Sequence, residues 1–237
     1  MRAVYKRELR AYFTSPLGYV IIGIMLFFLG NAFSILMGAD YGNISFLFYY
    51  VNTYVMLIPP LITMRLFSEE RKQKSDQLLF TAPVSITRIV LGKYFAAFTL
   101  FGLCFAVTLI FEIIFAALTE VNVLLYLSSL LGTALLGLSL LAIGTFISSI
   151  TESQIIAAIL GIISSLGIMM LDYLGNLFSN EFVSLIFTYL SFTTRYNTFN
   201  SGIIDFSNIV FFLSVSALFI FLTIRVHEKK RWAKRRS

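Results

Sequence analysis

Few side chains in the apolar parts of this chain could do chemistry, and their types do not suit catalysis. Cys104 is the one cysteine and His227 the one histidine, so neither an internal disulfide nor a Cys/His metal cluster can form. The carboxylates in or near apolar stretches are Glu112 and Asp172. A membrane-embedded enzyme needs paired acids, histidines or metal ligands inside the bilayer. That class is disfavoured, and Glu112 is expected to reach the outer interface or form a local hydrogen bond rather than relay protons.

A phosphate-binding loop of the G-x-x-x-x-G-K-[ST] type is also missing from the sequence. The one Gly-Lys pair, Gly92-Lys93, is followed by Tyr94 and has no glycine at the required upstream position. We therefore expect no cofactor in this chain and no ATP hydrolysis by it. If the protein does work driven by ATP, the energy must enter from a partner.

The richest polar chemistry lies in segment 65–93, RLFSEERKQKSDQLLFTAPVSITRIVLGK. Ser68 is expected to cap a helix, because the two glutamates that follow it are favourable at the positive end of a helix dipole. Pro83 breaks the chain, and Ser85 can cap a second helix. The unit has both charge signs and an apolar edge, as a protein-docking surface at a membrane would. A solvated connecting loop is the alternative, although a loop of this length with two helix signals is usually functional.

These polar segments must be positioned by apolar helices. The composition is 58% hydrophobic and 13% charged, with a mean hydropathy of +0.87, whereas soluble domains carry about 25% charge. Stretches of about 20 apolar residues match the length that a helix needs to cross a bilayer. The six stretches are approximately 17–37, 44–64, 95–118, 123–150, 154–171 and 206–224. The sequence predicts an all-α membrane protein with six transmembrane helices in a single domain, 1–237.

The basic residues fix the expected orientation. With the N-terminus inside, 17 of the 18 Lys and Arg residues fall on one side of the six-span arrangement, and Arg195 is the exception. Positively charged loops are retained in the cytoplasm, so a multi-pass protein with both termini cytoplasmic is expected. The net charge of +6 is thus explained by topology and by anionic headgroups, and no nucleic-acid partner is expected.

Two further segments are expected to lie at the membrane surfaces. Residues 2–14 place aromatic and basic side chains at helical spacing, which favours an amphipathic helix in the cytoplasmic interface over a frayed basic leader. Segment 175–205 is long but too apolar for a solvated loop. We expect it to fold back as short helices at the outer membrane surface, packed on protein.

The second predicted span has an unusual composition. Tyr50, Asn52 and Tyr54 could form a partly polar, aromatic wall along a path, but ordinary packing explains them equally well. The adjacent prolines Pro59 and Pro60 remove two intrahelical hydrogen bonds and should kink or break the helix.

The fifth predicted span carries small residues at steps of four, namely Ala157, Gly161 and Ser165. Small residues at this spacing let helices approach closely, so a packing role is the default for them.

Segment 65–93 and two other segments resemble the type-2 ABC exporter permeases, nearest to the subgroup related to the gliding-motility exporters. The central residues are Glu69-Glu70-Arg71-Lys72, Asp76-Gln77-Leu78-Leu79, Thr81-Ala82-Pro83-Val84-Ser85 and Val90-Leu91-Gly92-Lys93. The other two segments are Lys6-Arg7-Glu8-Leu9-x-x-Tyr12-Phe13-x-Ser15-Pro16 and Phe199-Asn200-Ser201-Gly202-Ile203-Ile204-Asp205. The resemblance covers nearly the whole chain, and the central segment is its most specific part.

The resemblance implies a membrane subunit of a transporter, with six spans, in a bacterial cell membrane. Two such permease subunits form a homo- or heterodimer, and each binds a separate cytoplasmic ATP-binding subunit that holds ATP and Mg. The helix after span two would be a coupling helix that rests on the ATPase, here Ser68–Phe80. The implied coupling residues are Ser68, Glu69, Glu70, Arg71, Lys72, Asp76, Leu79 and Pro83.

The family also lines its translocation path with spans two and five of both subunits. The residues of this chain that the resemblance places near the path are Tyr50, Asn52, Tyr54, Pro59, Gly161 and Ser165. A secondary transporter stays as the alternative, although coupling ions usually need buried charges or paired unwound helices at the midplane. The substrate is left open, and aromatic, weakly polar candidates would suit an amphiphile, a lipid or a peptide.

Overall fold

The computed structural model describes residues 1–38, 45–72, 84–118, 122–177 and 181–236. All regular structure in these ranges is helical, which confirms the all-α prediction. Four helical stretches are long and apolar enough to cross a membrane: Pro16–Gly38, Ile86–Phe111, Val123–Ile150 and Phe206–Arg231. The other two predicted spans correspond to the shorter helices α3 and α9.

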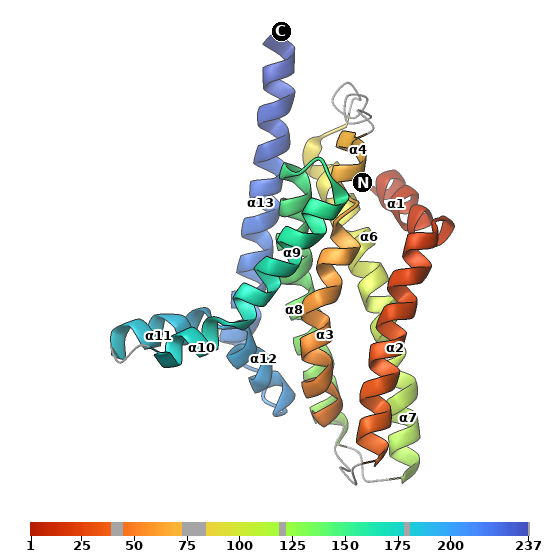
Figure 1. Cartoon of the computed structure of the whole chain (residues 1–237), viewed down its shortest axis with the longest axis vertical. Helices are drawn as coiled ribbons and strands as arrows, with labels where there is room; N and C mark the ends of the chain where they lie inside the picture. The colour runs from red at the N-terminus through yellow and green to blue at the C-terminus, as the bar shows by residue number, and fades with distance from the viewer. Residues whose placement is uncertain (39–44, 73–83, 119–121, 178–180, 237) are drawn as a thin grey trace.

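The helices run in chain order from the N-terminus (Figure 1). Their bounds are α1 Arg2–Thr14, α2 Pro16–Gly38, α3 Ser45–Thr63, α4 Ser68–Lys72, α6 Ile86–Ala106, α7 Thr108–Leu118, α8 Val123–Ile150, α9 Gln154–Met169, α10 Leu171–Leu177, α11 Glu181–Leu190, α12 Phe192–Asn200 and α13 Phe206–Arg236.

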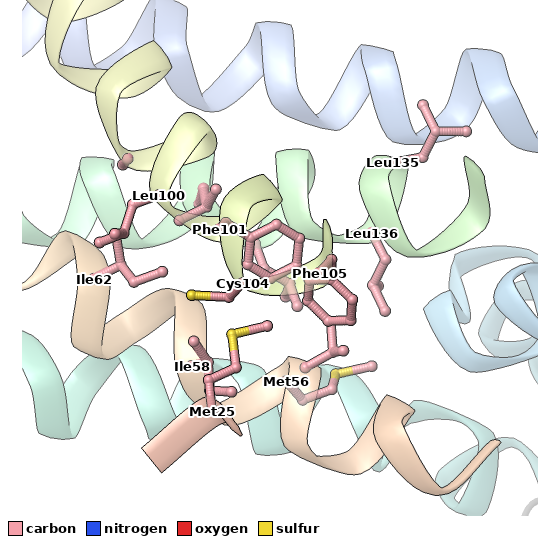
Figure 2. Packing of buried hydrophobic residues seen from close by; sticks show 14 of the residues in the cluster. Met25, Met56, Ile58, Ile62, Leu100, Phe101, Cys104, Phe105, Leu135 and Leu136 are labelled. Carbon is pink, nitrogen blue, oxygen red and sulfur yellow. The ribbon is translucent and has the colours of Figure 1, made fainter. Parts of the chain in front are cut away.

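Helix α8 lies at the centre of the bundle and packs against α3, α6, α9, α12 and α13. Its small residues allow the close approach, because a Cβ at Gly137 would come within 2.2 Å of the Phe101 ring. Several of its buried hydroxyl groups donate to carbonyls of the same helix, as Thr145 Oγ1 does to Leu141 O at 2.6 Å. Polar side chains that satisfy themselves in this way are compatible with an apolar core. Figure 2 shows the adjoining core, where residues of α2, α3, α6 and α8 interdigitate.

The prolines of the second predicted span do not break it. Helix α3 runs through Pro59 and Pro60 and ends at Thr63, so of the predicted kink or break the break is wrong. Both prolines are buried, and Pro60 packs against Gly161 of α9, where an added Cβ would lie 2.8 Å from the proline Cβ. Packing against a neighbouring helix is the condition under which spanning helices tolerate proline.

Two other predicted spans differ from the structure in their bounds. The third, 95–118, is divided into α6 and α7 at Val107, and α6 begins at Ile86 just after Ser85. The last continues beyond 224 without interruption to Arg236. Segment 175–205 forms short helices as expected, and in Figure 1 α10 and α11 project sideways from the bundle while α12 packs on α8.

Both termini lie at the same end of the bundle as α1 and α4, which we call the terminal end (Figure 1). Helix α1 crosses this end at a steep angle to α2. The corner between them requires Gly18, because a Cβ there would overlap the carbonyl oxygen of Tyr12. The sequence thus turns an amphipathic helix across the end of the bundle and brings it next to α4 and α6.

Candidate functional site

The candidate site is the polar cluster around α4 at the terminal end. The first turn of α4 is tied to α8 by Ser148, whose Oγ accepts from the backbone N–H groups of Phe67 (3.1 Å) and Ser68 (3.3 Å). The expectation that Ser68 caps this helix is corrected, since Ser68 lies inside α4 and its hydroxyl donates to Met64 O. A hydroxyl from a distant helix therefore satisfies donors that would be exposed at the helix start.

A buried ammonium group joins α4 to α1 and α6. Lys93 of α6 is 1% exposed, and its Nζ donates to Leu66 O at 2.6 Å. The same nitrogen lies 3.0 Å from Glu70 Oε1 and 3.2 Å from Glu8 Oε1. Three acceptors match the three N–H groups of the ammonium, which is the condition for burying such a charge without a large cost.

Arg7 closes the cluster from the outside. Its Nη2 lies 2.8 Å from Glu8 Oε1 and 2.8 Å from Glu70 Oε1, so two cations face two carboxylates. Burial alone raises the pKa of Glu8, but Lys93 and Arg7 outweigh it and hold that pKa below its usual value. Glu8 is therefore ionised at neutral pH, and it faces the two cations Lys93 and Arg7.

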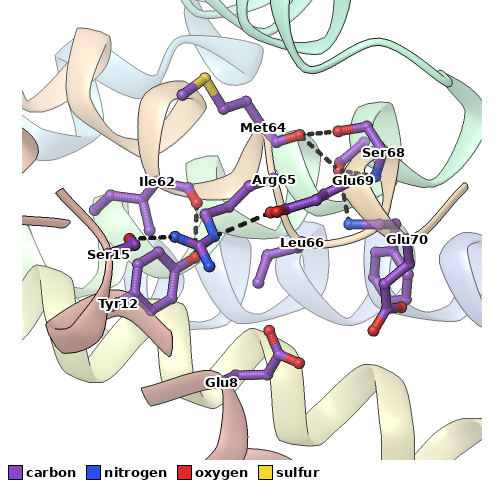
Figure 3. Close-up of polar contacts among 12 residues, drawn as sticks. Glu8, Tyr12, Ser15, Ile62, Met64, Arg65, Leu66, Ser68, Glu69 and Glu70 are labelled. Carbon is purple, nitrogen blue, oxygen red and sulfur yellow. Dashed lines mark hydrogen bonds and ion pairs between the residues drawn. The ribbon is translucent and has the colours of Figure 1, made fainter. Parts of the chain in front are cut away.

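A second set of contacts ties the α1–α2 corner to the end of α3. Arg65 donates from Nη1 to Ser15 Oγ at 2.7 Å, and its Nε lies 3.6 Å from Glu69 Oε2. The guanidinium lies over the Tyr12 ring, 5.0 Å from its centroid, and the Tyr12 hydroxyl donates to Ile62 O at 2.7 Å. Figure 3 shows these side chains meeting between α1 and the segment that follows α3.

On its other side α4 contacts the end of α8. Arg71 Nη2 lies 2.9 Å from Glu152, whose side chain is 75% exposed, and Arg71 Nη1 reaches Ser149 O. Lys230 of α13 donates to the same carbonyl at 2.9 Å. Cations suit the carboxyl end of a helix because its last carbonyls lack partners within the helix. Helix α4 is thus bound on one side to α1 and α6 and on the other to α8 and the turn before α9.

The comparison with protein families bears on this arrangement. Residues 31–225 match the family described as ABC-2 family transporter protein. The chain belongs to this family. It is therefore a multi-pass membrane protein and a permease subunit of an ABC transporter. None of the curated proteins compared with the permease matches it.

The structure places the implied coupling residues of the permease as follows. Glu69, Glu70 and Arg71 each contact a charged partner within the subunit. Lys72 is exposed at the end of α4. Three further candidates, Asp76, Leu79 and Pro83, lie outside the described residues, as does most of the predicted helix Ser68–Phe80.

Sequence reasoning missed Glu8, Lys93 and Ser148, which hold α4 in place. A lysine within an apolar helix is one available signal, because an ammonium in such a position needs a carboxylate partner. The sequence alone does not say which carboxylate that is.

The six path candidates of the permease do not form one surface within the subunit. Tyr50 is 39% exposed, whereas Asn52, two residues along α3 and on the opposite side, is 6% exposed. Tyr54 stacks on Phe28 of α2 with ring centroids 4.3 Å apart, as the packing interpretation expects. The other three candidates, Pro59, Gly161 and Ser165, are buried.

A hollow lies elsewhere in the permease. A cavity of about 270 Å³ opens between α6 and α8, and its lining includes Phe98, Phe105, Leu130 and Thr133. None of the lining residues is charged, so the cavity suits an apolar occupant and no proton chemistry.

Proposed function

We propose that this permease is the membrane subunit of an ATP-driven exporter, that it works as a dimer, and that α4 with the segment after it docks on a separate cytoplasmic ATPase. Membership of the ABC-2 family supports the transporter class. The observation that carries the coupling role is the position of α4 at the terminal end, where it contacts α1, α6, α8 and the turn before α9 through charged or hydroxyl side chains.

In this proposal the terminal end faces the cytoplasm and the chain crosses the membrane six times, with α3 and α9 as the two shorter spans. The basic residues before α2, around α4 and at the end of α13 support this orientation. A displacement of α4 by the ATPase would be transmitted directly to two spans, because α4 contacts Lys93 of α6 and Ser148 of α8. The alternative of a secondary transporter loses one support, since α3 does not break at its prolines.

The intramolecular contacts of α4 decide how the ATPase contact should be tested. A change such as Glu70→Arg would place a third cation beside Lys93 and Arg7, and it would disturb the subunit itself. Lys72 is exposed and makes no salt bridge with another described residue. It is therefore the better probe.

The experiment co-expresses the permease with its ATP-binding subunit and places a photo-crosslinking side chain at Lys72, with Ser201 at the end of α12 as the control. We expect a crosslink to the ATPase from Lys72 alone. Lys72→Glu should reduce co-elution or change ATP turnover while leaving the melting temperature of the permease unchanged. No crosslink from Lys72, together with unchanged co-elution and turnover in Lys72→Glu, would show that the end of α4 is not at the ATPase.

A further inference from the structure

The exposed side of α1 carries a stripe of basic residues that the coupling site does not use. Arg2, Lys6 and Arg10 recur every four residues, close to one helical turn, and all three are exposed. Phe13 lies on the same side of the helix and is 37% exposed. We call these four residues the α1 stripe.

The α1 stripe has no carboxylate to balance it. The one acid of α1, Glu8, is buried against Lys93 and Arg7 on the opposite side of the helix. None of the three basic side chains forms a salt bridge with another residue in the described part of the chain. The exposed side of α1 therefore presents three positive charges to its surroundings.

Helix geometry shows that three of the four residues of the α1 stripe are turned away from α4. Arg7 marks the side of α1 that faces α4, because it pairs with Glu70. At 100° per residue, Arg2, Lys6 and Phe13 lie roughly 140°, 100° and 120° around the helix from Arg7, whereas Arg10 lies about 60° from it. A protein that docks on α4 would therefore meet the side of α1 that carries Arg7, and not the side that carries Arg2, Lys6 and Phe13.

The position of α1 along the bundle also agrees with a place at the membrane surface. It joins α2, one of the candidate spans, through the single residue Ser15, so it lies where that span meets water. An exposed phenyl ring on the same side of a helix as basic side chains suits the boundary between headgroups and acyl chains, and it suits water poorly.

We propose that the α1 stripe binds the headgroups of anionic phospholipids, with Phe13 inserted among the acyl chains. Each basic side chain near an anionic surface contributes about a fivefold preference. Because Arg7 and Glu8 bind α1 to α4 and α6 from the other side, the lipid would also hold the terminal end at a fixed depth in the bilayer.

The test uses the full chain in nanodiscs and measures energy transfer from a donor dye on α1 to tail-labelled lipids. Ala3 is exposed on α1 and takes the dye as Ala3→Cys, in a Cys104→Ala background that removes the native thiol. Acceptor-labelled phosphatidylglycerol is compared with acceptor-labelled phosphatidylcholine at equal low fractions. The stripe variant is Arg2→Gln/Lys6→Gln/Arg10→Gln. The control, Arg225→Gln/Lys229→Gln/Lys234→Gln, removes the same charge from α13.

We expect the original stripe to enrich phosphatidylglycerol near the dye at least fivefold over phosphatidylcholine, and we expect the control to retain this enrichment. The stripe variant should show a ratio near one. If that variant does not fold, raising the salt from about 0.05 to about 0.5 M should abolish the enrichment of the unmodified stripe, because the Debye length shrinks severalfold.

Three results would overturn the proposal: no enrichment with the unmodified stripe, equal loss in the stripe and control variants, or enrichment that disappears when the ATPase is bound. The last would show that a protein covers the stripe.

Discussion

At the scale of single residues, Lys93 connects the helices of the terminal end. Its ammonium is buried among Glu8, Glu70 and the carbonyl of Leu66. Breaking a buried ion pair by removing one partner costs more than the pair contributes, because the remaining charge is left uncompensated. The interaction is therefore better probed by comparing single and combined substitutions than by one deletion.

We expect Lys93→Met to lower the free energy of unfolding by roughly 3 kcal/mol, the lower end of the range for a broken buried pair, since Arg7 still contacts both carboxylates. Denaturant unfolding in detergent, followed by circular dichroism, measures this. The variant Lys93→Met/Glu8→Gln/Glu70→Gln leaves no unpaired buried charge and should recover part of the loss. A combined variant no more stable than Lys93→Met would contradict our account of the cluster.

Acidic pH should remove the contribution of Glu8 to the stability of the folded protein. Its pKa in the folded protein is held below the unfolded value of about 4.3, because Lys93 and Arg7 outweigh the effect of burial. The stabilisation is complete above the unfolded pKa and disappears as pH falls through the lower folded pKa. The difference in melting temperature between the native chain and Glu8→Gln should therefore be constant near neutral pH, and it should vanish once the pH is below the lowered folded pKa. A difference that persists in acid would assign the effect to packing.

At the scale of elements, the contact between α3 and α9 depends on a glycine beside a proline. A Cβ on Gly161 would lie 2.8 Å from the Cβ of Pro60, whereas one on Gly167 of the same helix would meet no atom within 4 Å. We expect Gly161→Ala to destabilise the permease by about 1–3 kcal/mol through overpacking. Gly167→Ala should be neutral or stabilising, because Ala is the better helix former. Equal melting temperatures for the two variants would mean that α3 and α9 separate easily.

The corner between α11, α12 and α13 depends on Arg195. Its guanidinium donates to Tyr189 O at 2.9 Å and to Asn208 Oδ1 at 2.7 Å, and it lies over the Phe211 ring. We expect Arg195→Ala to speed amide hydrogen exchange in α11 by about 10–100-fold, the equivalent of losing charged hydrogen bonds.

Arg195→Lys is the informative companion variant. It keeps the charge but not the planar fork, so its exchange rates should lie between those of the other two proteins. Unchanged exchange in Arg195→Ala would show that α11 is held by packing alone.

At the scale of the whole molecule, the apolar stretches of the sequence predict most of the long helices. The length of such a stretch can be read from neighbouring residues alone, without knowing how the chain packs. The bounds of α8 agree with its predicted span, and Asn122 caps its first turn. The end of α13 could not be predicted from the apolar stretch, because the helix continues beyond that stretch into charged sequence. The pairing within the site could not be predicted either. Arg7 and Glu70 are 63 residues apart, and they meet through tertiary packing such as that of α1 against α6, which the sequence does not show.

The orientation of the whole permease can be tested with two single-cysteine variants in the Cys104→Ala background. Ser201 follows α12 and Lys229 lies near the end of α13, and both are exposed. If the terminal end is cytoplasmic, an impermeant thiol reagent applied to intact cells should label Ser201→Cys and not Lys229→Cys. After the cells are opened, both should label. The reverse pattern in intact cells would invert the proposed topology.

The cluster around Lys93 also sets an order of events during biosynthesis. Glu8 leaves the ribosome first, but its partner Lys93 follows 85 residues later, which at about 5–20 residues per second is a wait of roughly 4–17 s. Helices α2 and α3 lie between these residues in the chain and are made during that wait. Helix α1 therefore leaves the ribosome before α2 and α3 but cannot take its final position until α6 has emerged.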